Sequence, residues 1–227
     1  MRGLFITLSF CFASIFLSNA QSHELGAFVG VSGFMGDVGE QSYFNPKNPA
    51  IGVLYKYSPH PRYALRGSII STKLYGDDLD SGYPSRYRRG YMFENNILEI
   101  NANFEFNFLE FDPNDTETHV TPYVATGLAY FFMDKNFYTS DSRMAKSNIR
   151  KGDLAIPFTL GLKSNISNGF ILGLETGTRY TFSDNIDGSG PSGEGFGNTN
   201  SKDWYFFYGL TATFTLGNNY KNCRCPF

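Results

Sequence analysis

The stretch LEINANFEFNF, residues 98–108, decides the fold class of this 227-residue chain. Apolar and polar side chains alternate along it, with Leu98, Ile100, Ala102, Phe104, Phe106 and Phe108 set against Glu99, Asn101, Asn103, Glu105 and Asn107. Because successive side chains of a β-strand point to opposite faces, this alternation predicts a strand with one apolar and one polar face. In a soluble sheet the apolar face would meet a core, whereas in a membrane barrel it would meet lipid and the polar face would fill the interior.

Eight stretches in all have strand character, and they recur regularly along the chain. The composition, with 24 Gly, 23 Phe and 15 Tyr, suits β-sheets better than helices. Pro157 removes a backbone donor inside the sixth stretch, which predicts a bulge or a later strand start there. The strands are predicted at residues 23–34, 50–58, 63–75, 92–108, 120–133, 154–165, 169–183 and 203–217.

The connections between these strands alternate in length. Short or moderate connections cover 58–62, 109–119 and 165–169, and long ones cover 35–48, 75–91, 134–152 and 183–202. Such segregation with an even strand count is typical of bacterial outer-membrane barrels, whose turns are periplasmic and whose long loops lie outside. A soluble sandwich has no reason to segregate its loops in this way. The sequence therefore predicts an all-β fold, an eight-stranded antiparallel up-and-down transmembrane β-barrel with long outer loops and short periplasmic turns.

Aromatic residues collect near both ends of the apolar faces, as membrane interfaces favour. Ordinary aromatic packing in a soluble core is the alternative for any single strand. The outer group is Tyr130, Phe132, Tyr180, Phe182, Trp204 and Phe206, and the inner group is Tyr55, Tyr57, Phe106, Phe108, Phe170 and Phe214.

The two ends of the chain indicate export. Residues 1–20 combine a basic Arg2, an apolar stretch and small residues before Gln21, which predicts a secretory signal peptide; a buried N-terminal helix is the alternative. Residues 21–217 would form the outer-membrane barrel and 218–227 a periplasmic tail, so that both mature termini are periplasmic. The mature sequence has no run of about 20 apolar residues, the length that a spanning helix needs.

Charged residues recur on the polar faces of the strands. Eight-stranded barrels are just wide enough for side chains to fill them, and buried charges must pair. Four acids and four bases therefore predict an ion-paired filling rather than an open pore, with a proton or ion path as the alternative. The predicted interior charges are Glu24, Lys56, Arg66, Glu99, Glu105, Lys163, Glu175 and Arg179.

Catalysis and cofactor binding find little support in the sequence. His23, His60 and His119 fall in three separate elements, whereas a barrel lipid hydrolase would need a nucleophile and a base on one patch. GxSxG, HExxH and phosphate-loop motifs are lacking. The acidic loop at 76–82 could suggest calcium, but a solvated loop is the simpler interpretation. We predict no enzyme, no cofactor and no metal site, and the net charge of −2 argues against a nucleic-acid partner.

The tail NNYKNCRCPF holds the last two cysteines of the chain, Cys223 and Cys225. In the barrel model they lie in the oxidising periplasm. A bridge between them and a disulfide to a partner are both open, while zinc would require further ligands that are not nearby.

Long segments of the chain resemble a known family. Their sequences are HELGAFVGVSGFMGDVG, NPAIGVLYKYSPHPRYALRGS, SRYRRGYMFENNILEINANFEFNF, AIPFTLGLKS, LGLETGTRYTFSDNIDGS and NSKDWYFFYGL. They resemble the Bacteroidota outer-membrane barrel proteins related to PorG of the type IX secretion system, over almost the whole mature chain.

The resemblance implies a non-enzymatic outer-membrane component of the type IX protein secretion and gliding machinery. Such a component would anchor a periplasmic ring complex to the membrane, with outer-membrane lipid and a ring lipoprotein and ring protein of the PorK and PorN type as its partners. The turns and the tail with Cys223 and Cys225 would form the docking side. The alternative is a general small outer-membrane barrel whose outer loops are structural or bind a ligand.

Overall fold

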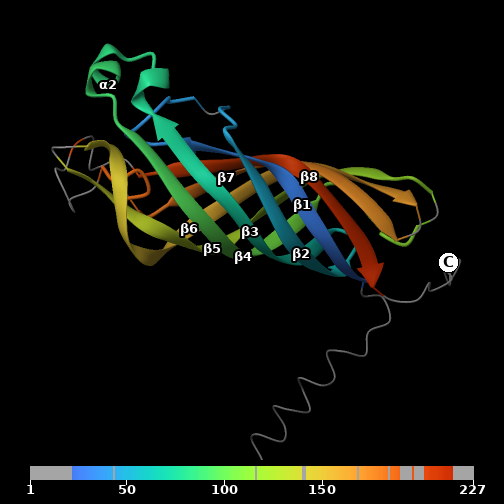
Figure 1. Cartoon of the computed structure of the whole chain (residues 1–227). Coiled ribbons are helices and arrows are strands. Elements are labelled where there is room, and N and C mark those ends of the chain that lie inside the picture. The colour runs from blue at the N-terminus through green and yellow to red at the C-terminus, as the bar shows by residue number, and fades with distance from the viewer. Residues whose placement is uncertain are drawn as a thin grey trace, which may run out of the picture.

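The strands close into a barrel, so the all-β prediction is confirmed (Figure 1). A computed structural model of the chain describes residues 22–42, 44–115, 117–139, 142–167, 169–183, 185–189, 196 and 202–216. The elements are β1 (Ser22–Met35), β2 (Asn48–His60), β3 (Tyr63–Asp77), the 3-10 helix η2 (Asp78–Asp80), α2 (Pro84–Arg89), β4 (Met92–Asn107), β5 (Val120–Thr139), β6 (Ser142–Ser167), β7 (Phe170–Thr181) and β8 (Trp204–Leu216). Each strand pairs antiparallel with the next, and β8 pairs with β1.

The connections gather at the two ends of the barrel. We call the end that carries η2 and α2 the loop end and the opposite end the turn end (Figure 1). At the turn end, β2 and β3 are separated only by residues 61–62, and β6 and β7 only by 168–169. At the loop end, the connections after β1, β3 and β7 are longer than these two, as predicted, while the third turn-end connection, residues 108–119, is as long as the connection after β1.

The predicted long loop at 134–152 is wrong. β5 continues to Thr139 and β6 begins at Ser142, so the two strands extend beyond the rest of the barrel as a hairpin. This segment contains no Pro and no Gly before Gly152, and nothing in it stops a strand. Tyr138 is buried against Tyr91, with ring centroids 4.3 Å apart, which anchors the hairpin to the barrel.

The bulge or later strand start predicted at Pro157 is also wrong. Pro157 pairs with Arg179 of β7 in an unbroken register. On the β5 side, Thr126 pairs with Phe158 and Ala129 with Ala155, so the register is the same before and after the proline. The missing donor interrupts the ladder without shifting it.

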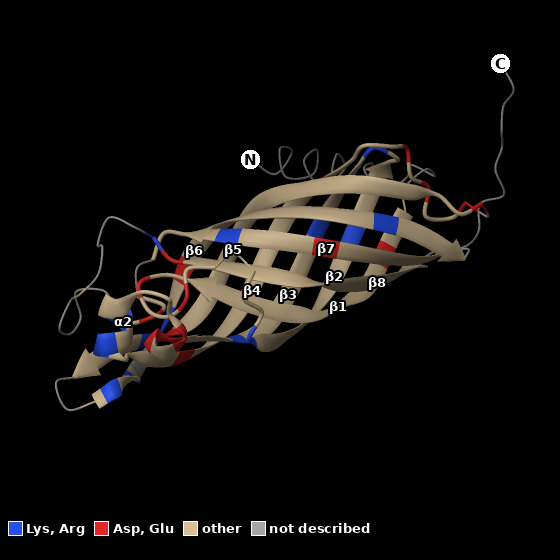
Figure 2. Ribbon diagram, turned by 90° about the horizontal axis from the view of Figure 1, so that it is seen from above, with Lys and Arg blue, Asp and Glu red and all other residues tan. Residues whose placement is uncertain are grey.

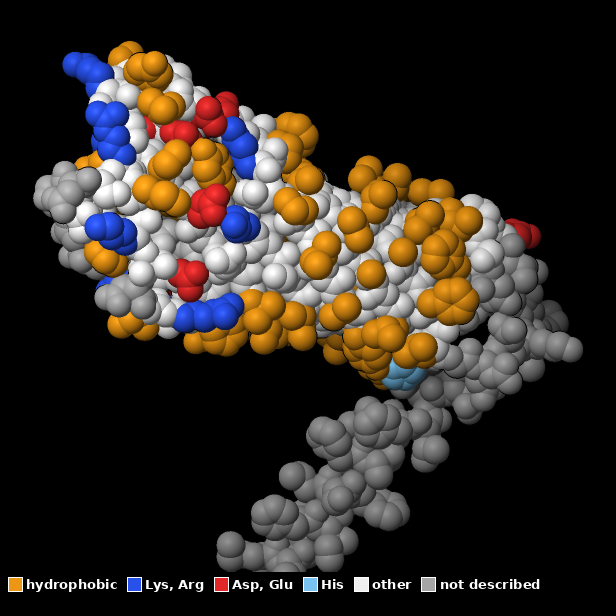
Figure 3. All heavy atoms as spheres, viewed as in Figure 1, with side chains coloured by type: hydrophobic (Ala, Val, Ile, Leu, Met, Phe, Trp, Pro, Cys, Tyr) orange, Lys and Arg blue, Asp and Glu red, His pale blue; other side chains and the backbone are white. Residues whose placement is uncertain are grey.

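The two faces of LEINANFEFNF separate as the alternation predicts. Glu99, Asn101, Asn103, Glu105 and Asn107 are buried inside the barrel, whereas Ile100, Phe104, Phe106 and Phe108 are exposed on its outer surface. Other strands of the barrel also carry apolar side chains on the outer surface: Leu128 of β5 is 63% exposed and Leu210 of β8 is 60% exposed. Hydrophobic side chains therefore spread over the flank of the molecule (Figure 3).

The interior differs from the prediction in one respect, because only the half toward the turn end is charged. The loop-end half holds an apolar core, in which Phe28 contacts Phe207 and Phe131 contacts Tyr205. Leu54, Ile70 and Ile97 contribute to the same core. In the sequence these positions lie in runs where both faces of the strand are apolar. The alternation of polar and apolar residues therefore does not show which of these side chains face the interior.

Aromatic side chains form contacts near both ends of the outer surface. Toward the loop end, Tyr180 contacts Trp204, with centroids 5.0 Å apart, and Tyr130 contacts Phe132 at 5.1 Å. Toward the turn end, Phe106 contacts Phe108. None of the helices in the described part of the chain is long and apolar enough to cross a membrane.

Candidate functional site

The candidate site begins with the charged half of the interior, whose side chains cross-link distant strands. Arg66 of β3 reaches across to Glu175 of β7, and its two terminal nitrogens donate to the two carboxylate oxygens at 2.6 and 2.9 Å. The Tyr123 hydroxyl of β5 donates to the same carboxylate at 2.6 Å. All three side chains are buried, and the bidentate geometry is the strong form of an arginine–carboxylate pair.

A second cluster surrounds Glu105 of β4. The ammonium groups of Lys56 on β2 and Lys163 on β6 lie 2.9 and 2.6 Å from its two carboxylate oxygens. The Lys163 nitrogen also lies 4.7 Å from the centre of the Phe111 ring. One carboxylate thus serves two buried cations, and an aromatic face gives one of them a further favourable contact.

The third cluster is centred on Glu99, also on β4. Arg179 of β7 donates to it through Nε at 3.1 Å, the Tyr205 hydroxyl of β8 donates at 2.6 Å, and the Asn101 amide donates at 2.6 Å. Glu99 is fully buried, so these bonds replace its hydration. Figure 2 shows charged positions on the strands toward the turn end, apart from the group around α2.

Glu24 is the predicted interior charge that the structure leaves out of the ion pairs. The Thr213 hydroxyl donates to one of its carboxylate oxygens at 2.8 Å, and the other oxygen has no hydrogen-bond partner among the described residues. The structure therefore brings seven of the eight predicted charges into three clusters. Cys223 and Cys225, the other predicted site residues, lie outside the described residues, as does the predicted signal peptide.

Several members of these clusters were missed in the sequence. Tyr123 and Tyr205 supply hydroxyl donors to buried carboxylates, and Phe111 is buried at the turn end. Tyr205 shares the strand phase of Thr211 and Thr213, which places it inside the barrel, but this phase does not identify Glu99 as its partner. Phe111 lies in a connection, where strand periodicity gives no guidance.

The turn end is covered by the connection between β4 and β5. The Phe111 backbone N–H donates to Pro61 O at 3.2 Å, and the Asn107 amide donates to the same carbonyl at 2.9 Å. The Phe111 side chain is only 3% exposed and lies beside Lys163. With the interior filled by ion pairs and apolar side chains, this geometry describes a barrel packed along its axis.

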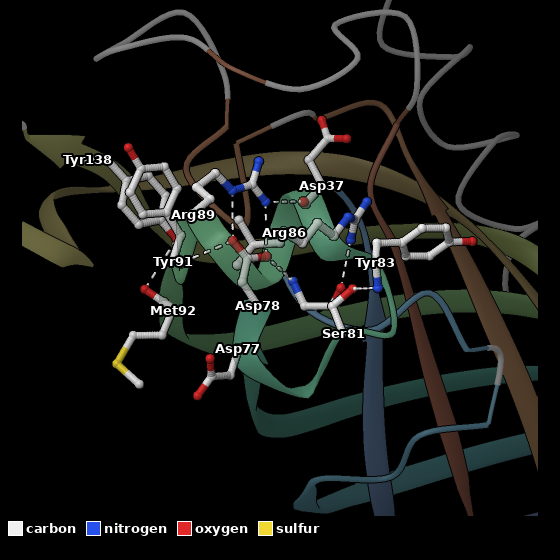
Figure 4. A network of polar contacts seen from close by, with 12 residues as sticks. Asp37, Asp77, Asp78, Ser81, Tyr83, Arg86, Arg89, Tyr91, Met92 and Tyr138 are labelled. Atoms are coloured by element: carbon white, nitrogen blue, oxygen red, sulfur yellow. Dashed lines mark hydrogen bonds and ion pairs between the residues drawn. The ribbon is translucent and has the colours of Figure 1, made fainter.

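The loop end is held by a second polar network, centred on Asp78 of η2 (Figure 4). Its fully buried carboxylate accepts bonds from Arg89 Nε at 2.7 Å, from Gly39 N at 3.0 Å and from Tyr91 N at 3.0 Å. Arg86 of α2 donates to Gly39 O at 2.7 Å. α2 and the β1–β2 connection are thus fastened to one another through a single carboxylate and two arginines.

A second buried carboxylate, Asp187, fastens the β7–β8 connection to the β1–β2 connection. It accepts from the backbone N–H groups of Asp37 at 2.8 Å, Val38 at 3.1 Å and Ser189 at 2.9 Å. Burial raises the pKa of Asp187 above its ordinary value, and the hydrogen bonds oppose this shift. Burial also raises the pKa of the Tyr138 hydroxyl, which donates to Met92 O nearby.

These contacts correct the solvated-loop interpretation of residues 76–82. Asp77 accepts from Leu79 N, Asp78 is bound to Arg89, and Asp80 pairs with Lys47 at 2.7 Å. The three carboxylates therefore serve three different partners. In the part of the chain that the structure describes, no group of three or more His, Cys, Asp or Glu residues could hold a metal ion.

The three histidines remain apart. His23 bonds to the Tyr55 hydroxyl on the outer surface, His60 accepts from Arg62 N in a turn, and His119 contacts Asp115. A nucleophile and a base are therefore not brought together around any of them within the described ranges.

Asp78→Asn is expected to loosen the loop end. The variant keeps the side-chain shape but places an NH2 group against the N–H donors that now bind the carboxylate. Because hydrogen bonds to a charged group are lost, the free energy of unfolding should fall by about 2 kcal/mol or more. Hydrogen exchange of residues 36–42 and 84–91 should accelerate. Asp80→Asn is the matched control, since its exposed pair with Lys47 is worth about 1 kcal/mol or less. Equal exchange in the two variants would contradict the assignment of Asp78 as the fastening residue.

Comparison with known proteins gives distant structural likenesses and one family. The N-terminal β-barrel domain of OprF from Pseudomonas aeruginosa is 13% identical, with a TM-score of 0.44 over 86% of this chain and 98% of that chain. Ail of Yersinia pestis, solved with the heparin analogue sucrose octasulfate, is 13% identical, with a TM-score of 0.42 over 86% and 97%. The outer-membrane protein AlkL is 11% identical, with a TM-score of 0.48 over 90% and 94%. Likenesses of this degree assign no function.

No curated protein matches the sequence. A family model described as a domain of unknown function, DUF6089, matches residues 2–226. The chain belongs to this family, DUF6089.

Proposed function

We propose that the protein is a small, non-enzymatic outer-membrane β-barrel, packed along its axis and not conducting, whose fastened loop end forms a platform outside the cell. The observation that carries the proposal is the inverted distribution of side chains: large apolar residues cover the outer surface, and charged residues lie inside. In water such an apolar surface would be an aggregation hazard, whereas in a bilayer it is the expected lipid-facing band.

The height of the apolar surface supports a membrane location. On β6 the alternating run of exposed apolar side chains extends from Leu154 to Ile166, and Met144 and Ile149 are exposed separately, further toward the loop end. Twelve residues span about 40 Å along a strand, or roughly 30 Å across a bilayer at the usual strand tilt. The apolar band of outer-membrane barrels is about 25 Å tall, so the surface has the height that one membrane requires.

Trp204, the single tryptophan of the chain, allows a direct test. It lies at the loop-end edge of the apolar surface, in contact with Tyr180. In vesicles whose acyl chains carry bromine near the carbonyl, its fluorescence should be quenched more strongly than in vesicles brominated near the chain terminus. The folded protein should also migrate differently from the boiled protein on a gel. Unquenched fluorescence in folded protein would reject the membrane location.

Leu210→Arg is expected to destabilise the membrane-embedded barrel by about 2 to 4 kcal/mol, the cost of arginine near the midplane of a lipid-facing surface. Leu210 lies in the middle of the exposed face of β8. Leu79→Arg is the control, because Leu79 is 51% exposed in η2, outside the apolar band, and should tolerate the charge. Urea unfolding in vesicles measures both, and equal midpoints would indicate that the surface of β8 faces water.

A more specific role rests on the sequence resemblance alone: anchoring of a periplasmic ring complex of the type IX secretion system through the turn end and the tail. In that case, purification under non-reducing conditions should recover a periplasmic lipoprotein, and Cys223→Ser or deletion of residues 218–227 should weaken the recovery. Loss of function on replacement of residues 183–203, with a dispensable tail, would favour the loop platform instead.

A further inference from the structure

The β5–β6 hairpin carries basic side chains directly above the apolar surface. β6 continues past Leu154, the residue at which its alternating apolar run ends, through Gly152 to Arg150 and Lys146, with the exposed Ile149 beside Arg150. Arg150 and Lys146 are exposed. Four residues correspond to about 13 Å along the strand, and to roughly 10 Å of height at the usual tilt, so Arg150 lies at the depth of lipid head groups.

The surroundings of Arg150 confirm this level by an independent contact. Its guanidinium carbon lies 5.9 Å from the centre of the Phe132 ring, one of the aromatic side chains at the loop-end edge of the outer surface. Phe132 itself contacts Tyr130, whose ring lies against Gly152. Arginine therefore follows directly after the aromatic belt, at the position where an outer leaflet would present its phosphates.

The basic side chains of this edge have two acidic neighbours in the described chain: Asp134 lies opposite Arg150 in the β5–β6 ladder, and Asp153 lies 3.9 Å from Lys151. Elsewhere at the loop end, cations and acids pair: Lys47 with Asp80 at 2.7 Å, and Lys73 with Glu94 at 3.0 Å. Arg150 and Lys146, in contrast, form no ion pair with any carboxylate in the described ranges, and neither does Arg143 further along the hairpin. Figure 3 shows Lys and Arg side chains gathered at the loop end, beside the hydrophobic flank.

We propose that Arg150 binds phosphate groups of outer-leaflet lipids, so that the hairpin acts as a lipid-binding edge of the barrel. The inference rests on the proposed membrane location. Guanidinium binds phosphate through two parallel hydrogen bonds, and a basic residue near an anionic membrane surface strengthens binding about fivefold. The phosphate can belong to a phospholipid or to a phosphorylated glycolipid, and the experiment separates these sources.

The test uses the full chain, folded in nanodiscs of phosphatidylcholine alone, with added phosphatidylglycerol, with a phosphorylated glycolipid, or with the same glycolipid after dephosphorylation. Lipid retained by the protein is measured by native mass spectrometry. Arg150→Gln should lower retention of at least one phosphate-bearing anionic lipid about fivefold. Arg150→Lys should retain more than Arg150→Gln. The lipid that responds identifies the source of the phosphate.

Arg88→Gln is the matched control, since it removes one exposed cation from α2. The Arg88 Nε group donates a hydrogen bond to Pro84 O within the same helix. The lipid retention of this variant should equal that of the unmodified protein. Unchanged retention in Arg150→Gln, or equal retention of the phosphorylated and dephosphorylated glycolipid with no preference for phosphatidylglycerol, would overturn the proposal. Trp204 quenching in the same samples tests the membrane location separately from phosphate binding. If Trp204 is quenched but the hairpin variants retain lipid normally, phosphate binding is rejected and the membrane location stands.

Discussion

Glu105→Gln should destabilise the barrel by about 3 to 5 kcal/mol, the typical cost of removing one partner from a buried ion pair. The variant leaves the ammonium groups of Lys56 and Lys163 buried without the carboxylate that serves both. Because a domain of this size is stable by only about 5 to 15 kcal/mol, the loss should be evident as a lower urea midpoint for folded protein in vesicles.

Glu24→Gln is the control for this experiment. Glu24 is as buried as Glu105, but within the described residues its carboxylate accepts a hydrogen bond only from the Thr213 hydroxyl and forms no ion pair. Loss of that bond should cost about 1 to 2 kcal/mol at most. If the two variants unfold at the same urea concentration, burial rather than pairing sets the cost, and the assignment of Glu105 as the bridge between two lysines is wrong.

Arg66→Met is expected to destabilise the barrel by a similar amount, about 3 to 5 kcal/mol. It leaves the Glu175 carboxylate buried, with the Tyr123 hydroxyl as its remaining close donor. Methionine fills part of the space of the arginine stem, so most of the loss would come from the unpaired charge. The same unfolding measurement in vesicles detects it.

A double variant separates charge from packing at this pair. Arg66→Met combined with Glu175→Gln removes both charges and keeps an acceptor for Tyr123. Replacing a whole buried ion pair is often neutral, so the double variant should recover most of the stability that Arg66→Met loses. A double variant no more stable than the single one would show that the pair acts through shape, contrary to the geometry.

The sequence predicted the strands well because alternation is a local property. For 98–108, each side chain lies on the face that the period of two assigns to it. The segment 134–152 was predicted as a loop because its few apolar residues do not alternate with polar ones, so strand periodicity gave no signal there. Its order comes from contacts such as Tyr138 with Tyr91, which join residues distant in sequence.

The candidate site divides in the same way. The eight interior charges could be found because each shares the phase of its strand, and all eight are buried. Their partners could not be found, since pairing depends on which strands face one another across the barrel. Nor does composition indicate that Asp78 would be buried, because its burial depends on Arg89 and on the backbone of Gly39.

The three ion-pair clusters cross-link strands through the interior of the barrel, and not every strand takes part. They join β2, β3, β4, β6 and β7, whereas β1 and β8 contribute no charged partner to them in the described chain. The seam at which the first and last strands meet is held by the backbone ladder and by neutral or singly charged bonds such as Thr213 with Glu24. The two strands that close the ring therefore lie outside the ion-pair clusters, and their seam depends on the backbone ladder and on single side-chain hydrogen bonds.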